Sequence, residues 1–166
     1  AELVRRKVNS ILSPKEKEYI DYIRTGFLDM IPLPLLEGRI SPRDLKDIIY
    51  GNPIIDIEDM RRNIVLDVYQ IDSMQIQWLF AFLESCDQET RGKFLRFVTS
   101  NPRLPLGGFA ALPMKMSIGV HNGGDEQLPT THTCYYKLNL PRYTSEALLR
   151  DRITAAINSD AAMGED

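Results

Sequence analysis

Two cysteines and two histidines have the most distinctive chemistry in this chain, and one of each lies in a single short segment. Cys134 follows His132 by two positions within LPTTHTCYYKLNLPRY, residues 128–143. In an extended segment alternate side chains point to the same side, so the imidazole could approach the thiol. A cysteine reacts as its thiolate, and a cysteine beside a histidine is a usual arrangement for nucleophilic catalysis on acyl groups. Because such a short pattern often occurs by chance, spacing alone favours ordinary strand packing over catalysis, and both interpretations stay open.

The other cysteine and the other histidine do not extend this site. Cys86 comes at the end of an apolar helical segment, where a free thiol packs as a small hydrophobe, so we expect it in the core. His121 lies in a glycine-rich stretch and is expected to be solvated. The positions 86, 121, 132 and 134 do not have the spacing of zinc ligands, and we expect no metal and no cofactor.

The composition of the chain excludes several classes of protein. The formal net charge is −3 and the pI is about 5.5, so no basic field indicates nucleic acid as a partner. The longest apolar run, WLFAFL at 78–83, is too short to span a membrane, and the start of the chain lacks the apolar core of a signal peptide. Two cysteines make no disulfide framework, which favours a reducing compartment, cytoplasmic or nuclear or both.

The elements that must position Cys134 can be predicted from periodicity and capping residues. Apolar residues at helical spacing predict helices over 14–31, 42–51, 74–85 and 88–100 and within 141–159. Residues 56–66 are predicted to form either a short helix or a helix followed by an extension. The candidate N-caps are Ser13, Ser41, Asp56, Asp72 or Ser73, and Asp87. Alternating residues predict strands over 114–118 and 133–140, the second with Cys134, Tyr136, Leu138 and Leu140 on one side. Residues 69–73 are predicted to be a linker.

Several ordered motifs of the chain resemble those of HECT-type ubiquitin ligases. The segments similar to the C-terminal lobe of that family are QIQWLFAFLESCDQETRGKFL at 75–95, FLRFVTSNPRLPLGGFAAL at 94–112 and LPTTHTCYYKLNLPRYTSEALLRDRITAAI at 128–157. Residues 22–63 are similar to the last helices of its N-terminal lobe. The resemblance implies an α+β fold, in which 1–68 is the partial, helical end of the N-lobe, 69–73 a hinge, and 74–166 a C-lobe with a short sheet flanked by helices.

The same resemblance implies a two-step transfer of ubiquitin. Cys134 would accept ubiquitin as a thioester from a conjugating enzyme and pass it to a lysine of a protein substrate, since a thiolate is both a good nucleophile and a good leaving group. The subdomain that docks the conjugating enzyme is expected to lie upstream of this chain. The implied site residues are His132 and Thr133 beside Cys134, then Leu128, Pro129, Thr131 and Tyr135 for the ubiquitin tail, and Met163 as a C-terminal anchor.

Departures from the family pattern keep an alternative function open. Tyr135 and Tyr136 replace the usual Phe-Asn, Asn139 stands where Asp is common, and Met163 replaces a phenylalanine at the fourth position from the end. The alternative is a ubiquitin- or substrate-binding module whose chemistry has decayed. A Cys-His hydrolase is a third interpretation, which is disfavoured because no Asn or Asp that would orient the histidine can be identified.

Overall fold

The chain forms two compact units, residues 1–45 and 46–166. The computed structural model describes residues 7, 10–36, 38–67, 73–121 and 123–162, and for 33, 35, 120, 121 and 160–162 it describes the backbone alone. Among the described helices, none combines the length and the apolar character that a membrane crossing needs.

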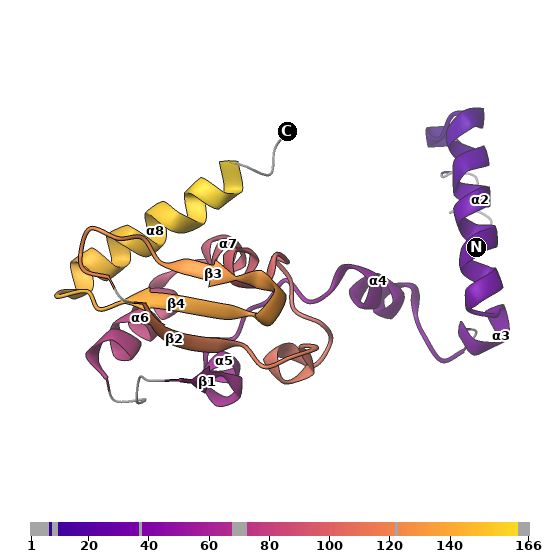
Figure 1. Ribbon diagram of the computed structural model, residues 1–166. Coiled ribbons are helices and arrows are strands. Elements are labelled where there is room, and N and C mark those ends of the chain that lie inside the picture. Colours follow the sequence, from indigo (N-terminus) through magenta and orange to yellow (C-terminus); the bar gives the residue numbers. More distant parts are fainter. Residues whose placement is uncertain (1–6, 8–9, 37, 68–72, 122, 163–166) are drawn as a thin grey trace. The chain divides into compact units, whose positions relative to one another are not determined.

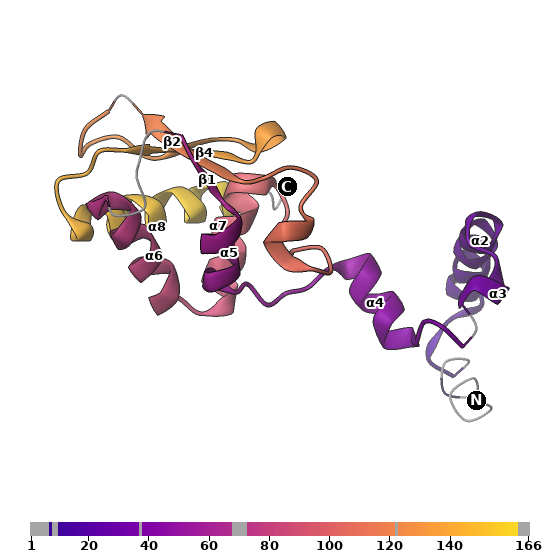
Figure 2. The same cartoon turned by 90° about the horizontal axis from the view of Figure 1, so that it is seen from below.

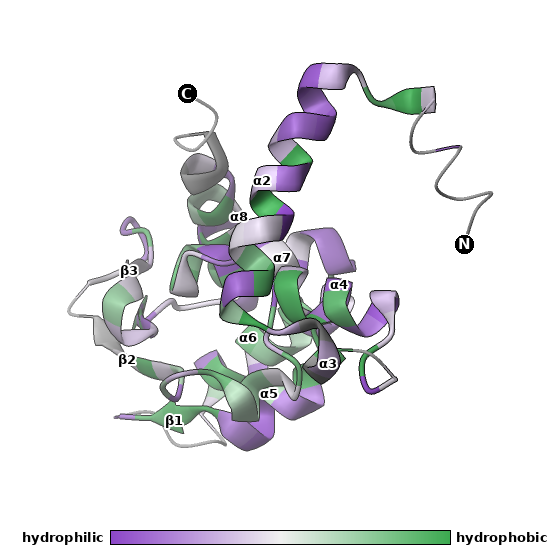
Figure 3. Ribbon diagram, turned by 90° about the vertical axis from the view of Figure 1, so that its right-hand side faces the viewer, coloured by the Kyte–Doolittle hydropathy of each residue, from purple (hydrophilic) through white to green (hydrophobic). Residues whose placement is uncertain are grey.

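The first unit consists mainly of helix α2 (Pro14–Met30) and the short helix α3 (Leu33–Leu36). Ser13 caps α2 as predicted: its hydroxyl accepts from the Glu16 N–H at 3.3 Å, and the Glu16 carboxylate accepts from the Ser13 N–H at 2.7 Å. This reciprocal capping box satisfies two backbone donors at the helix start. Hydrophilic residues dominate α2, as Figure 3 shows, and none of its side chains is buried.

The second unit combines a small sheet with helices. Its helical elements are the last residues of α4 (Pro42–Tyr50), then α5 (Ile57–Asn63), α6 (Met74–Ser85), α7 (Gln88–Thr99), α8 (Glu146–Ala162) and the 3-10 turns η1 (Gly108–Ala111) and η2 (Thr133–Tyr135). Its strands are β1 (Val65–Leu66), β2 (Ser117–His121), β3 (Thr130–His132) and β4 (Lys137–Pro141). They lie in the order β1-β2-β4-β3, and only β3 is antiparallel to its neighbour (Figure 1). The predicted mixture of helices and a short sheet is confirmed.

Short polar side chains begin the helices of the second unit where the sequence predicted them. Asp56 caps α5, Ser73 caps α6 and Asp87 caps α7, and each side chain accepts a hydrogen bond from a backbone N–H of the first turn. Such a cap contributes about 1 kcal/mol, because the first N–H groups of a helix have no partner within the helix.

The helices α5 to α8 cover one face of the sheet (Figure 2), and α8 packs against both α6 and α7. Ile118, Leu138 and Leu140 point into this layer and are fully buried. Each such side chain contributes about 1.5–3 kcal/mol relative to an exposed one. The predicted inward set of the last helix is also confirmed, since Leu149, Ile153, Ala156 and Ile157 are all buried. Alternation leaves Lys137 and Asn139 on the opposite face of the sheet, partly exposed.

Helix α5 and strand β1 belong to the same core as the segment that follows the predicted linker. Ile57 and Met60 of α5 are buried in the main hydrophobic cluster. β1 extends the sheet, because it pairs in parallel with β2 and the Val65 N–H donates to the Met116 C=O at 2.9 Å. Both elements thus contribute to one layered structure with β2 and β4.

The expected division of the chain into lobes at residues 69–73 stays a prediction. In the structure, residues 46–67 form one compact unit with those from 73 onward. The buried face of α5 brings this segment into the shared core. Residues 68–72 lie outside the described residues, so a hinge there stays a prediction.

Strand β2 begins later than the alternation of residues 114–118 predicted. Met116 and Ile118 are buried, but the strand starts at Ser117, and Met114 is 41% exposed. The pairing with β4 sets this start, because Ser117 lies opposite Lys137, the first residue of β4.

Asp59 of α5 holds the glycine turn of the LPLGGF motif against the core. Its Oδ2 accepts from the N–H of Phe109, a buried residue, at 2.8 Å. Gly108 has a φ of +71°, and a Cβ at this position would collide with the Asp59 carboxylate. Glycine is therefore required both by the left-handed backbone and by the close approach of Asp59.

Replacement of Gly108 by alanine should lower the free energy of unfolding by about 2 kcal/mol or more. A left-handed alanine costs about 1–2 kcal/mol, and the added methyl group must displace the Asp59 carboxylate. The measurement is urea unfolding followed by the fluorescence of Trp78, the single tryptophan, which packs against the core. Gly124→Ala is the control, because nothing lies within 4 Å of a Cβ there. Equal stability of the two variants would contradict the prediction.

Candidate functional site

Cys134 lies in the 3-10 turn η2, which joins β3 to β4. These strands are antiparallel, and the last pair before the turn is His132 with Lys137. The chain therefore reverses direction within the four residues 133–136. The predicted strand over 133–140 is wrong in its first part, because β4 begins only at Lys137.

Tyr136 ends the turn in the left-handed conformation, with φ 48° and ψ 42°. Its N–H donates to the Thr133 C=O at 3.3 Å, and its C=O accepts from the Ser117 N–H of β2 at 3.0 Å. The left-handed residue interrupts the alternation that grouped Tyr136 with Leu138 and Leu140, which is why a pattern of period two did not reveal the turn.

The turn presents the Cys134 thiol to solvent. The thiol is exposed, the neighbouring Tyr135 side chain is 70% exposed, and η2 rests on helix α7. Ordinary strand packing, which the spacing alone favoured, does not describe this residue. An exposed thiol on a supported turn can be reached by a macromolecular partner.

His132 does not form a hydrogen bond with Cys134 in the described part of the chain. The expectation that the two side chains share one side assumed an extended segment, but β3 ends at His132 and the thiol lies in the turn. The imidazole is exposed and lies opposite Lys137 in the antiparallel register. The structure therefore brings His132 near the turn without pairing it to the thiol.

Strand β3 forms an edge of the sheet and pairs only with β4 among the described residues. Its outer side thus leaves backbone donors and acceptors available to an extended peptide. Pro129, just before the strand, is buried, whereas Leu128 is 41% exposed. Thr131 and Thr133 are half-buried, which fixes the strand where it enters the turn. A peptide added along this edge would run beside Cys134.

Residues near the start of α8 hold the loop that leads into β3. The buried Tyr143 donates from its hydroxyl to the Gln127 C=O at 2.8 Å. The Asp125 carboxylate accepts from the Thr144 hydroxyl at 2.7 Å and from the Thr144 N–H at 2.8 Å. Arg152 Nε donates to the Asp125 C=O at 2.7 Å. The sequence identified the Leu-Pro-x-Tyr ending only as a family motif, because these partners are too distant along the chain for a local pattern to show them.

On the face of the sheet opposite the helices, an ion pair passes over β2. Lys137 Nζ lies 2.6 Å from Asp67 Oδ2. Gly119 of β2 lies beneath the pair, and a Cβ there would come within 2.8 Å of the Lys137 side chain. The pair links the end of β1 to the strand that follows the turn, and at this exposure it contributes up to about 1 kcal/mol. No local pattern in the sequence revealed this pair, because its two residues lie 70 positions apart.

The remaining candidates lie elsewhere. Cys86 ends α6 and is half-buried against the core, as expected. Burial raises the pKa of its thiol, although the nearby Arg150 and Arg91 act in the opposite direction. Met163 lies outside the described residues. Within the ranges that the structure describes, no three His, Cys, Asp or Glu side chains are grouped so as to hold a metal ion.

Comparisons with known proteins agree on one family. Residues 1–165 match the model of the HECT-domain (ubiquitin-transferase) family. The chain is 40% identical over 137 residues to the E3 ubiquitin-protein ligase HUWE1 of Mus musculus, which covers 80% of this chain and 3% of that protein. It is 34% identical over 160 residues to the E3 ubiquitin-protein ligase ptr1 of Schizosaccharomyces pombe, covering 93% of this chain and 5% of that protein. The chain thus spans a small fraction of the length of these relatives.

Iodoacetamide should modify Cys134 several-fold faster than Cys86 near neutral pH. Cys134 is exposed, whereas Cys86 is half-buried and has a raised thiol pKa, and alkylation requires an accessible thiolate. Mass spectrometry of the two peptides at timed intervals measures both rates. In concentrated urea the two rates should converge. Equal rates in the folded chain would contradict the placement of the two thiols.

The hydrogen bonds to the Asp125 carboxylate should make the stability of the fold depend on pH in the acidic range. Hydrogen bonds from the Thr144 hydroxyl and then from its N–H hold the pKa of the Asp125 carboxyl below its ordinary value. The carboxylate therefore stabilises the fold above the unfolded-state pKa of about 3.9, and this contribution is lost as the pH falls from there through the folded-state pKa. The stability difference between the wild type and Asp125→Asn, measured by urea unfolding, should be constant from about pH 8 to 6 and shrink below about pH 4. A difference that is unchanged at about pH 3 would refute this.

Proposed function

The chain belongs to the HECT-domain (ubiquitin-transferase) family, and on this premise we propose that it accepts ubiquitin as a thioester on Cys134 and transfers it to a lysine of a protein substrate. Membership of the family confirms the resemblance found in the motifs. The observation that carries the proposal is the exposed thiol of Cys134, held in a turn beside the open edge of β3.

The proposed reaction has two acyl transfers. In the first, the Cys134 thiolate attacks the carbonyl carbon of a ubiquitin thioester, a new C–S bond forms, and the donor thiolate leaves. In the second, a lysine amine attacks the same carbon, an isopeptide bond forms, the Cys134 thiolate leaves and the amine loses a proton to solvent. Covalent catalysis of this kind divides one difficult step into two easier ones. The exposure of the thiol supports it, because two proteins must reach the sulfur in turn.

The open edge of β3 supports a place for the ubiquitin tail. An extended tail can add to this edge as a further strand, so that main-chain hydrogen bonds hold its end near Cys134. On this proposal Leu128 and Tyr135 contact the tail, since both are exposed. Pro129 and Thr131 act indirectly, because they are buried or half-buried and set the course of the strand.

His132, Thr133 and Met163 complete the proposed site with supporting roles. His132 has no hydrogen bond to the resting thiol, so we assign to its exposed imidazole the orientation of the bound tail, together with Thr133. Met163 is proposed as the apolar C-terminal anchor, which its flexible thioether side chain suits. Ubiquitin, a conjugating enzyme and protein substrates are the partners that the reaction requires.

The wild-type chain should form a thiol-sensitive adduct when mixed with ubiquitin whose C-terminus is a thioester of a small thiol. This donor tests the acceptor thiol directly, because it needs no docked conjugating enzyme. Cys134→Ala should abolish the adduct on a non-reducing gel, and Cys86→Ser, which removes the half-buried thiol, should retain it. Circular dichroism of both variants establishes that they are folded.

The alternative functions give different results in the same assay. A decayed binding module would bind ubiquitin without any thiol-sensitive adduct. A hydrolase would release ubiquitin from a peptide-linked substrate without an activated donor. If Cys134→Ala formed the adduct and Cys86→Ser did not, the acceptor would be Cys86, and the proposal would be rejected.

A further inference from the structure

Tyr136 has a backbone conformation that its residue type does not favour. It is one of two residues other than glycine with positive φ in the described part of the chain. Asparagine or glycine would adopt this conformation with less strain, and either would preserve the hydrogen bonds that its N–H and C=O make with Thr133 and Ser117. The backbone conformation of the turn therefore does not account for a tyrosine at position 136. The reason for this residue type must lie in its aromatic ring.

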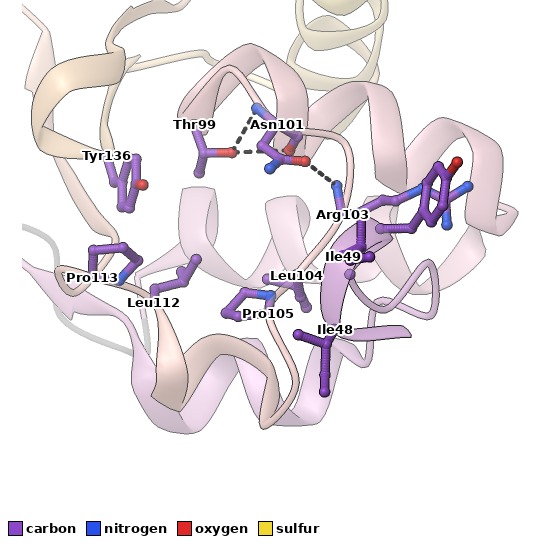
Figure 4. Close-up of a pocket in the computed structure, with 12 residues that line it drawn as sticks. Ile48, Ile49, Thr99, Asn101, Arg103, Leu104, Pro105, Leu112, Pro113 and Tyr136 are labelled. Carbon is purple, nitrogen blue, oxygen red and sulfur yellow. Dashed lines mark hydrogen bonds between the residues drawn. The ribbon is translucent and has the colours of Figure 1, made fainter. Parts of the chain in front are cut away.

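The Tyr136 ring forms one wall of a surface pocket next to the turn of Cys134. The pocket has a volume of about 270 Å³, and Leu104, Pro105 and Leu112 supply apolar surface to it. Figure 4 shows Tyr136, Leu112 and Pro113 on one side and Ile49 and Arg103 on the other. Sites for whole small molecules measure roughly 300–1,000 Å³. This pocket is therefore of a size for one or two side chains.

Hydrogen bonds keep the polar end of the pocket in place. The Thr99 hydroxyl donates to the Leu95 C=O at 2.8 Å. It also accepts from the Asn101 N–H at 3.2 Å, and Asn101 Oδ1 accepts from the Arg103 N–H at 3.0 Å (Figure 4). The Arg103 side chain is exposed and forms no ion pair within the described residues. A guanidinium at the rim of an apolar pocket complements an acidic group on a partner.

The pocket lies on the side of the turn away from the open edge of β3. Tyr136 is bonded to Ser117 of β2, whereas β3 is the outer strand on the far side of β4. A ubiquitin tail along β3 would leave the pocket free. The pocket therefore suits the second protein of the reaction, the one that brings the attacking lysine.

We propose that Tyr136 is a specificity-determining residue for the acceptor protein. Its ring separates the Cys134 turn from a pocket that takes an apolar side chain next to the target lysine, while Arg103 binds an acidic residue beside it. This inference rests on the proposed function, because it concerns the second transfer. It identifies the acceptor by local chemistry: a lysine with a leucine-sized side chain and a carboxylate as near neighbours.

The test compares acceptor peptides on the ubiquitin-loaded chain. Excess donor is removed, and peptides with one lysine are added, the lysine flanked either by leucine and glutamate or by serine and glutamine. The wild type should transfer ubiquitin to the first peptide about tenfold faster, as expected when an apolar group fills a fitted pocket. Tyr136→Asn should bring the ratio of the two rates close to one, and Tyr136→Phe should keep it. Arg103→Glu should lower the rate with a leucine–glutamate peptide relative to a leucine–glutamine peptide.

The ratio separates a specificity role from a structural one. A residue that only supports the turn would slow both peptides equally and leave the ratio unchanged, so an unchanged ratio in Tyr136→Asn overturns the inference. Equal rates in the wild type also overturn it. Ile54→Ala, which removes an exposed apolar side chain outside the pocket, should leave the ratio as in the wild type. Failure of the wild-type chain to load ubiquitin is a different outcome, which rejects the proposed function itself.

Discussion

The reversal of the chain between β3 and β4 is the constraint on which the rest of the structure depends. Antiparallel strands joined by four residues need a tight turn, and Tyr136 completes it in the left-handed conformation. If residues 133–136 continued as a strand, alternation would place Cys134 on the same side as the buried Leu138. The turn prevents this and exposes the thiol. The exposure of Cys134 is therefore a consequence of strand pairing and not of a polar surrounding sequence.

The turn keeps its place because contacts far along the chain fix the strands on both sides of it. Leu138 and Leu140 anchor β4 beneath the helices, and Tyr143 holds the loop that enters β3. Lys137, the first residue after the turn, is joined to Asp67 across β2. These contacts act on the flanking strands and not on the sulfur. The Cys134 thiol is thus positioned without being enclosed, which a place inside the core could not achieve.

Local features of the fold could be predicted from the sequence, and features that depend on distant residues could not. Asp87 was identified as a cap, and Ser73 as one of two candidates, because a cap depends on residues two or three positions away. The burial of Leu138 and Leu140 followed from alternation. In contrast, the hydrogen bond between Asp59 and Phe109 joins residues 50 positions apart, and no local sequence pattern reveals it. The same holds for α5 and β1, whose place in the core became clear only from packing. The turn itself was missed because a left-handed tyrosine contradicts the preference of its residue type.

On the proposed function, an open site is what the chemistry requires. Exchange of one thioester for another breaks one C–S bond and forms a second of the same kind, so the reaction depends on alignment of the partners more than on a change in bond type. A deep cavity around the sulfur would exclude a protein acceptor. A thiol in a turn admits the ubiquitin tail along the edge of β3 and the acceptor from the side of Tyr136. Because the two partners lie on different sides of Cys134, the acceptor can approach the thioester carbon while the ubiquitin tail is still held along β3. The strands that flank the turn fix the position of the thioester between the two partners.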